Sequence, residues 1–236
     1  MALLRPFVLA LAALWLAGGC ATPPAPGRTA AHAEAALDPV SSPDWAGDMA
    51  RFAAEDGARP PPAHPVVFTG SSSVRLWTAL AEDFPGIPVL NRGFGGSQLR
   101  DAVWYADQVA VRYRPSRIVL YAGDNDINAG RTPEQVSADF RAFVARIRRD
   151  LPRVPIVLLA IKPSLARLPQ LPAQQRANAL LAADAAALPG VSFVDVATPM
   201  LDAAGRPRAE LFVEDGLHMN RRGYDLWRGI LAPHLR

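Results

Sequence analysis

The chain of 236 residues is long enough for one domain of ordinary size together with a leader. Half of its residues are hydrophobic and a fifth are charged, which excludes a chain that is disordered throughout. The formal net charge is +3, and the arginines that carry it are scattered without a basic run or a nucleic-acid-binding motif, so we expect no nucleic-acid partner.

The first 20 residues have the pattern of an export signal. Arg5 precedes an apolar run over residues 7–17, and Gly18 and Gly19 lead to Cys20, the single cysteine of the chain. The run is too short to cross a membrane as a helix. Small residues that end at a cysteine resemble a bacterial lipoprotein signal, in which Cys20 becomes the lipidated first residue. The alternative is an ordinary secretory signal with an incidental cysteine.

Either kind of signal directs the mature protein out of the cytoplasm. Ala21 follows the cysteine, and by resemblance to the sorting rules of Gram-negative lipoproteins this residue favours the outer membrane. We therefore expect an extracytoplasmic protein that faces the periplasm and is held to the membrane by an N-terminal lipid anchor.

Composition divides the chain into three segments. Residues 1–19 form the signal peptide, and residues 20–43 are rich in alanine and proline, as expected of a flexible tether. One folded domain follows over residues 44–236, and it opens with apolar residues at helical spacing between Trp45 and Phe52.

Short apolar strands and helical patterns alternate along this domain. Strands are expected at residues 66–69, 88–91, 117–121, 156–161 and 191–196. Helices are expected at residues 99–113, 173–188 and 222–231, and another begins at Pro133 behind a capping box of Thr132 and Gln135. The alternation predicts an α/β fold, a three-layer α/β/α sandwich around a five-stranded parallel sheet.

Chemically capable residues follow the strands of this predicted sheet. Ser72 comes after the first strand, Gly96 after the second and Asn125 after the third. The segment DGLH, residues 215–218, lies between the fifth strand and the last helix, so it can return to the same edge. Because ligands bind beyond the carboxyl ends of parallel strands, these segments predict one site.

A serine needs a base to become a nucleophile, and His218 is the best placed of the four histidines. Asp215 precedes it by three residues and can fix the ring tautomer that presents the other nitrogen to a serine. Among the adjacent Ser71, Ser72 and Ser73 we favour Ser72 as the nucleophile. The alternatives are an ordinary surface-loop histidine and serines that serve only as a turn and helix cap.

Glycines in the turn after the second strand suggest close approach of a ligand to the backbone. Gly93, Gly95 and Gly96 do not form a dinucleotide-binding fingerprint, because Gln98 stands where that motif needs glycine. Their N–H groups can donate to a negative oxygen, and the Asn125 amide can do the same. Plain turns are the alternative for both segments.

Together these segments resemble the SGNH hydrolases, also called GDSL esterases and lipases, from residue 66 to the C-terminus. The resemblance implies Ser72 as nucleophile, with Asp215 and His218 as acid and base. It implies an oxyanion hole made by Ser72, Gly96 and Asn125. It also implies a flavodoxin-like fold and a reaction that needs no metal ion or organic cofactor.

One position departs from the family pattern. Ser71 stands where the family motif GDS has aspartate. Since the triad acid of the family belongs to the last block, the resemblance implies that the chemistry persists.

We therefore expect a serine esterase that acts on acyl esters, lysophospholipids or O-acetyl groups of glycans. An O-acyltransferase acting on envelope glycans and a catalytically inert, lipid-anchored binding module are the alternatives. Four aromatic residues either line an acyl or sugar pocket or belong to the core: Trp77, Phe94, Trp104 and Tyr105.

Overall fold

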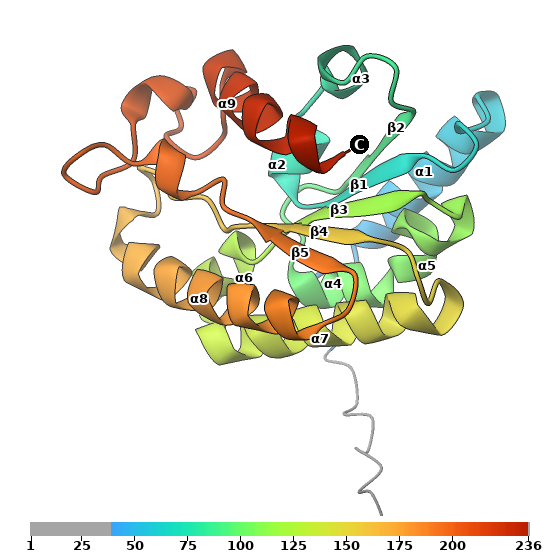
Figure 1. Cartoon of the computed structure of the whole chain (residues 1–236), viewed down its shortest axis with the longest axis horizontal. Coiled ribbons are helices and arrows are strands. Elements are labelled where there is room, and N and C mark those ends of the chain that lie inside the picture. Colours follow the sequence, from blue (N-terminus) through green and yellow to red (C-terminus); the bar gives the residue numbers. More distant parts are fainter. Residues whose placement is uncertain (1–38, 236) are drawn as a thin grey trace, which may run out of the picture. The chain divides into compact units, whose positions relative to one another are not determined.

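A computed structural model describes residues 39–235, so the predictions for the signal peptide, for Cys20 and for most of the tether lie outside the described residues. Five parallel strands form one sheet in the order β2-β1-β3-β4-β5 (Figure 1). The strands are β1 (Val66–Gly70), β2 (Val89–Gly93), β3 (Arg117–Tyr121), β4 (Ile156–Leu159) and β5 (Val191–Val194). The predicted α/β class and the five-stranded parallel sheet are confirmed, and the strand order is the flavodoxin-like one.

Helices cover both faces of the sheet and complete the three predicted layers (Figure 1). One face packs against α1 (Trp45–Ala58), α4 (Leu99–Trp104), α5 (Ala106–Val109), α7 (Pro133–Asp150) and α8 (Leu171–Ala187). The other face packs against α2 (Ser72–Arg75), α3 (Leu80–Asp83) and α9 (Arg221–Leu231). Successive residues of β3 and β4 enter the two cores in turn, which explains why these strands are apolar without alternation.

Short helices lie in the connections and after α9. They are α6 (Asp124–Asn128), η1 (Val111–Tyr113), η2 (Leu168–Gln170), η3 (Thr198–Met200), η4 (Ala209–Leu211) and η5 (Ala232–His234). Within residues 39–235, no helix combines the length and the apolar character that crossing a membrane requires.

The helix expected over residues 99–113 is divided into α4, α5 and η1. Tyr105 leaves helical geometry at the first junction, where its ring meets the edge of Phe94 at a centroid distance of 6.3 Å. Ala110 ends the regular turns at the second junction with ψ of −59° and φ of −146°. A packing contact with a distant segment thus interrupts a pattern that is continuous in the sequence.

Strand β4 ends two residues before the expected position. The side chain of Asn178 on α8 accepts from the N–H of Ile161 at 2.7 Å and donates to its carbonyl at 2.9 Å. This amide takes both backbone groups of Ile161, so neither of them can continue the sheet ladder.

The aromatic residues divide between core and surface. Trp77 and Phe94 are buried and belong to the core. Trp77 packs against Tyr224 and Trp227 of α9 at centroid distances of 5.2 and 6.2 Å. Trp104 is about half exposed, with a relative accessibility of 52%.

The start of the described chain is fixed to α4 by hydrogen bonds. Ser41, which falls within the predicted tether, donates to the carboxylate of Asp101 through its N–H at 2.6 Å and its hydroxyl at 2.5 Å. The indole of Trp45 donates to the Ser41 hydroxyl at 3.1 Å and lies edge to face with Phe94.

A glycine at the end of β1 sets the position of the segment that follows. Gly70 has φ of +117°, and a Cβ there would lie 1.8 Å from the carbonyl oxygen of Tyr121. The same oxygen accepts the N–H of Ser71 at 2.9 Å, after which α2 begins at Ser72. Only glycine permits this close approach and this backbone conformation.

Gly70→Ala should therefore lower the free energy of unfolding by about 3 kcal/mol or more, because the added methyl group strikes the β3 backbone and strains a positive φ. Urea unfolding followed by circular dichroism measures the change. Gly229→Ala is the matched control: it lies within α9 with open space around its Cβ, so we expect no loss and a gain of up to about 1 kcal/mol. Equal midpoints for Gly70→Ala and wild type would contradict this account.

Candidate active site

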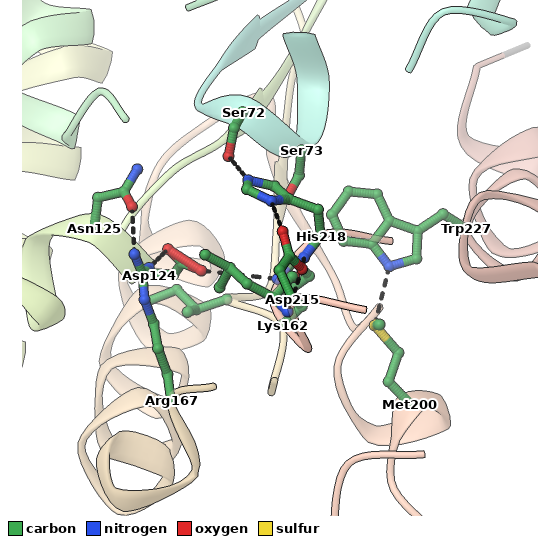
Figure 2. Close-up of polar contacts among 12 residues, drawn as sticks. Ser72, Ser73, Asp124, Asn125, Lys162, Arg167, Met200, Asp215, His218 and Trp227 are labelled. Carbon is green, nitrogen blue, oxygen red and sulfur yellow. Dashed lines mark hydrogen bonds and ion pairs between the residues drawn. The ribbon is translucent and has the colours of Figure 1, made fainter. Parts of the chain in front are cut away.

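Three of the predicted residues form one hydrogen-bonded line at the carboxyl edge of the sheet (Figure 2). Nε2 of His218 lies 3.0 Å from Oγ of Ser72, and Nδ1 lies 2.6 Å from Oδ2 of Asp215. Since the carboxylate can only accept, Nδ1 carries the proton and Nε2 is free to accept from the Ser72 hydroxyl. The structure thus joins residues that are 146 positions apart in the chain.

Asp215 is held as an anion by the turn in which it lies. Burial raises the pKa of Asp215, but the His218 N–H, the His218 ring and the Leu217 N–H outweigh it and lower that pKa to about 2. Both N–H groups donate to Oδ1 at 2.8 Å. A group that is ionised at any moderate pH can orient the imidazole and stabilise its protonated form.

The DGLH segment is a tight turn closed by its flanking residues. Phe212 and Met219 form an antiparallel bridge, and the N–H of Val213 donates to the His218 carbonyl at 2.9 Å. Gly216 has φ of +61°, which favours glycine at that position of the turn. This closure explains why an acid three residues before the histidine reaches its ring.

Three hydrogen-bond donors predicted for the oxyanion hole lie on neighbouring segments. In the described part of the chain, the N–H groups of Ser72 and Gly96 have no hydrogen-bond acceptor. Nδ2 of Asn125 donates one hydrogen to the carbonyl of Ser97 at 3.0 Å, which leaves its second hydrogen for a ligand. The glycine-rich turn is tied to the serine turn because Phe94 donates to the Gly70 carbonyl at 2.8 Å.

Gly96 itself is covered by an aromatic side chain that the sequence did not associate with the site. A Cβ on Gly96 would lie 3.1 Å from the ring of Trp45, and Gly96 has φ of +89°. The spacing of Trp45 indicated only a helix packed on the body, so no sequence signal connects it with the glycine turn.

Three further charged residues adjoin the predicted set (Figure 2). Arg167 donates to Oδ1 of Asn125 at 2.9 Å and forms an ion pair with Asp124. Lys162 donates to the Leu217 carbonyl at 2.7 Å, and its Nζ lies 3.8 Å from the Asp124 carboxylate. The one available signal was that Lys162, the only lysine of the chain, directly follows an apolar strand.

A match to the pattern of the GDSL-like lipase/acylhydrolase family extends over residues 55–226 and includes all five predicted site residues. The chain belongs to this family. It is accordingly an ester-hydrolysing enzyme, as the resemblance of its four motifs implied.

Other proteins resemble this chain over most of its length. It is 29% identical to the human platelet-activating factor acetylhydrolase IB subunit alpha1 over 189 residues, which cover 76% of this chain and 78% of the relative. A solved protein structure from Streptococcus pneumoniae, described as a platelet activating factor, superimposes with a TM-score of 0.71. The two chains are 25% identical, and the match covers 81% of this chain and 92% of that one. A GDSL-like lipase from Bacteroides thetaiotaomicron has the same fold, with a TM-score of 0.69 at 19% identity over 79% and 96% of the two chains.

The position where this chain departs from the GDSL motif is buried behind the serine. Ser71 is 2% exposed, its N–H donates to the β3 edge, and its carbonyl accepts from Val74 and Arg75 of α2. The Ser71 backbone therefore supports the turn on which Ser72 stands.

Within residues 39–235, no group of three or more histidine, cysteine or acidic side chains is arranged to hold a metal ion.

Asp126 of the GDND motif is a buried carboxyl beside the site. Burial raises the pKa of Asp126 to about 7, although the N–H of Leu99 donates to its Oδ1 at 2.9 Å and opposes the shift. Its Oδ2 has no hydrogen-bond partner within the described residues. The fold therefore favours the protonated acid over the anion.

The Asp126 shift predicts how stability changes with pH. Because the folded pKa of about 7 lies above the ordinary 3.8, the native state keeps a proton that the unfolded chain releases. The contribution of Asp126 to the free energy of unfolding is fully present below about pH 4. It falls by roughly 1.4 kcal/mol per pH unit until the pH passes about 7. The asparagine of Asp126→Asn cannot ionise, so the stability of this variant relative to wild type should increase as the pH rises.

Urea unfolding at pH 5, 6, 7 and 8 measures this difference. The free energy of unfolding of Asp126→Asn minus that of wild type should increase steadily and level off near pH 8. Asp107→Asn, at an exposed acid that pairs with Arg112, should show a difference that changes little with pH. Parallel curves for Asp126→Asn and wild type would show that the buried carboxyl is ionised throughout.

Proposed function

We propose that this chain is a serine esterase in which Ser72, His218 and Asp215 catalyse acyl transfer from an ester to water. The observation that carries the proposal is the line of two hydrogen bonds, 3.0 and 2.6 Å long, from the serine through the imidazole to an ionised carboxylate. This is the arrangement that activates a hydroxyl nucleophile at neutral pH.

In the first half-reaction His218 Nε2 takes the proton of the Ser72 hydroxyl while Oγ forms a bond to the ester carbonyl carbon. The carbonyl electron pair moves to oxygen and gives a tetrahedral oxyanion. When this collapses, the carbon–oxygen bond to the alcohol breaks and His218 returns its proton to the leaving oxygen. The product is an acyl ester of Ser72.

In the second half-reaction water replaces the alcohol. His218 takes a proton from water, and the resulting hydroxide attacks the acyl carbon. Collapse releases the acid as Ser72 regains its proton from His218. We assign the free N–H groups of Ser72 and Gly96 and the second hydrogen of the Asn125 amide to the oxyanion, which needs donors fixed before charge develops.

For the substrate we propose esters of short acyl groups, of which acetate is the simplest. The relative that is 29% identical is named an acetylhydrolase, which supports this choice. Exposed apolar side chains beside the catalytic turn can contact an ester with an apolar portion. Leu165 lies against Gly216, and Val213 precedes the turn with 46% of its surface exposed.

The proposal predicts the behaviour of p-nitrophenyl esters with acyl groups from acetyl to palmitoyl. Wild type should cleave the shortest esters fastest, and Ser72→Ala should lose about a thousandfold or more in kcat/KM because no acyl-enzyme forms. Asp215→Asn should lose roughly a hundredfold or more, whereas the neighbouring Ser71→Ala should keep most of its activity.

The same assay separates the competing outcomes. Equal cleavage by wild type and Ser72→Ala would remove Ser72 as the nucleophile. A maximum at palmitoyl would replace the short-acyl proposal with a lipase. No cleavage by wild type, with rapid labelling of Ser72 by a fluorophosphonate, would favour an acyltransferase that requires an acceptor hydroxyl.

We further propose that the enzyme acts at the cell envelope, attached through lipidated Cys20. The support is the sequence alone, an apolar run that ends in Gly18, Gly19 and Cys20. The full chain expressed in a Gram-negative host should fractionate with membranes, and Cys20→Ser should abolish that association. Membrane association of Cys20→Ser equal to wild type would contradict lipidation. Release of the wild-type chain into the soluble periplasm would favour the ordinary secretory signal.

A further inference from the structure

The guanidinium of Arg167 holds the oxygen end of the Asn125 amide. One of its nitrogens donates to Oδ1 of Asn125 at 2.9 Å. Because arginine has no acceptor, it can bind the oxygen of the amide but not its nitrogen. Nδ2 is therefore directed to the other side, where it contacts the Ser97 carbonyl in the glycine-rich turn. The Ser97 carbonyl can only accept, so it binds the nitrogen end of the amide, and Arg167 and Ser97 together set the orientation.

Arg167 is itself fixed by a buried carboxylate. Its second terminal nitrogen forms an ion pair with Oδ1 of Asp124, the residue before Asn125. Asp124 is only 5% exposed and has a second cation, Lys162, 3.8 Å from its other oxygen. One carboxylate thus restrains two cations that lead to different parts of the site (Figure 2).

Lys162 connects this carboxylate to the catalytic turn. Its Nζ donates to the carbonyl of Leu217 at 2.7 Å, between the acid and the base of the triad. The backbone makes a second attachment, since the N–H of Ala166 donates to the Gly216 carbonyl at 3.0 Å. Residues 162–167 therefore hold the catalytic turn at two points and the Asn125 amide at a third.

Folding stability alone gives a weak reason for such a network. Lys162 is 1% exposed, and burial lowers the pKa of its amine while the charge of Asp124 opposes that effect. Burying an ion pair costs desolvation free energy that its attraction offsets only partly, and apolar residues of similar volume often give equal or higher stability. What apolar residues cannot provide is directed hydrogen bonds to an amide oxygen and a turn carbonyl.

We propose that Arg167, Asp124 and Lys162 form a positioning network that orients the Asn125 amide toward the oxyanion and holds the His218 turn against Ser72. This inference rests on the proposed function, because the network acts through residues that we assign to catalysis. None of the three touches the reacting atoms, so they are positioning residues. The network ties the oxyanion donor and the acid–base pair to one carboxylate.

A double-mutant cycle with p-nitrophenyl acetate tests the Arg167 branch. Arg167→Met should lower kcat by about tenfold, less than the hundredfold or more expected for Asn125→Ala, with little change in KM. In an Asn125→Ala background, Arg167→Met should lower kcat no further, because the amide through which Arg167 acts is absent. An equal loss in both backgrounds would overturn the inference and leave the esterase assignment standing.

Arg167→Lys tests geometry against charge. A lysine keeps the positive charge beside Asp124 but lacks the planar fork that reaches two acceptors at once. It should lose nearly as much kcat as Arg167→Met while unfolding at a temperature close to wild type. Full activity in Arg167→Lys would show that the positive charge alone is sufficient, which would contradict the orienting role of the guanidinium. Arg176→Met, at an exposed arginine on α8 that pairs with Glu134, is the matched control and should match wild type.

An activity-free measurement keeps the inference testable if no ester is cleaved. The side-chain amide resonances of Asn125 in ¹⁵N-labelled protein are identified by their loss in Asn125→Ala. They should shift in Arg167→Met and stay in place in Arg176→Met. Lys162→Met should instead shift the ring resonances of His218. Unchanged Asn125 resonances in Arg167→Met would overturn the proposal whatever the enzyme assay shows.

Discussion

The contact between the Gly70 and Tyr121 backbones is the constraint on which the catalytic edge depends. Strands β1 and β3 approach so closely there that a side chain on Gly70 would strike the Tyr121 carbonyl. That carbonyl accepts the Ser71 N–H, which turns the chain out of the sheet and starts α2 with Ser72 at its first residue. The serine is thus positioned by the sheet itself.

The residues that act with Ser72 lie on segments that the structure holds in different ways. Asn125 stands at the start of a helix that directly follows β3, so the same sheet positions it. The turn with Asp215 and His218 lies far from the strand ends along the chain and is closed by its own backbone bonds. It needs external attachment to stay in register with Ser72, and the segment after β4 provides it at Gly216 and Leu217.

Much of this arrangement is predictable from the sequence because it depends on local patterns. Short, apolar, β-branched runs indicate the strands, the Thr132 capping box starts α7 as expected, and strand ends locate three of the site residues. The Asp215–His218 spacing is equally local. Arg167 and Trp45 were not predictable, because their roles depend on which distant atoms they meet. The division of residues 99–113 was not predictable either, since Tyr105 contacts the ring of Phe94 where α4 ends.

The burial of Lys162 has a practical consequence. It is the only lysine in 236 residues, and 1% of its surface is exposed. Apart from the α-amino group, amine-directed reagents therefore meet no accessible target on the folded domain, and coupling through lysine is unsuited to immobilising it. The same reagents become a probe of opening at the catalytic edge, because the rate at which Lys162 is modified reports how often the segment after β4 separates from Asp124 and the catalytic turn.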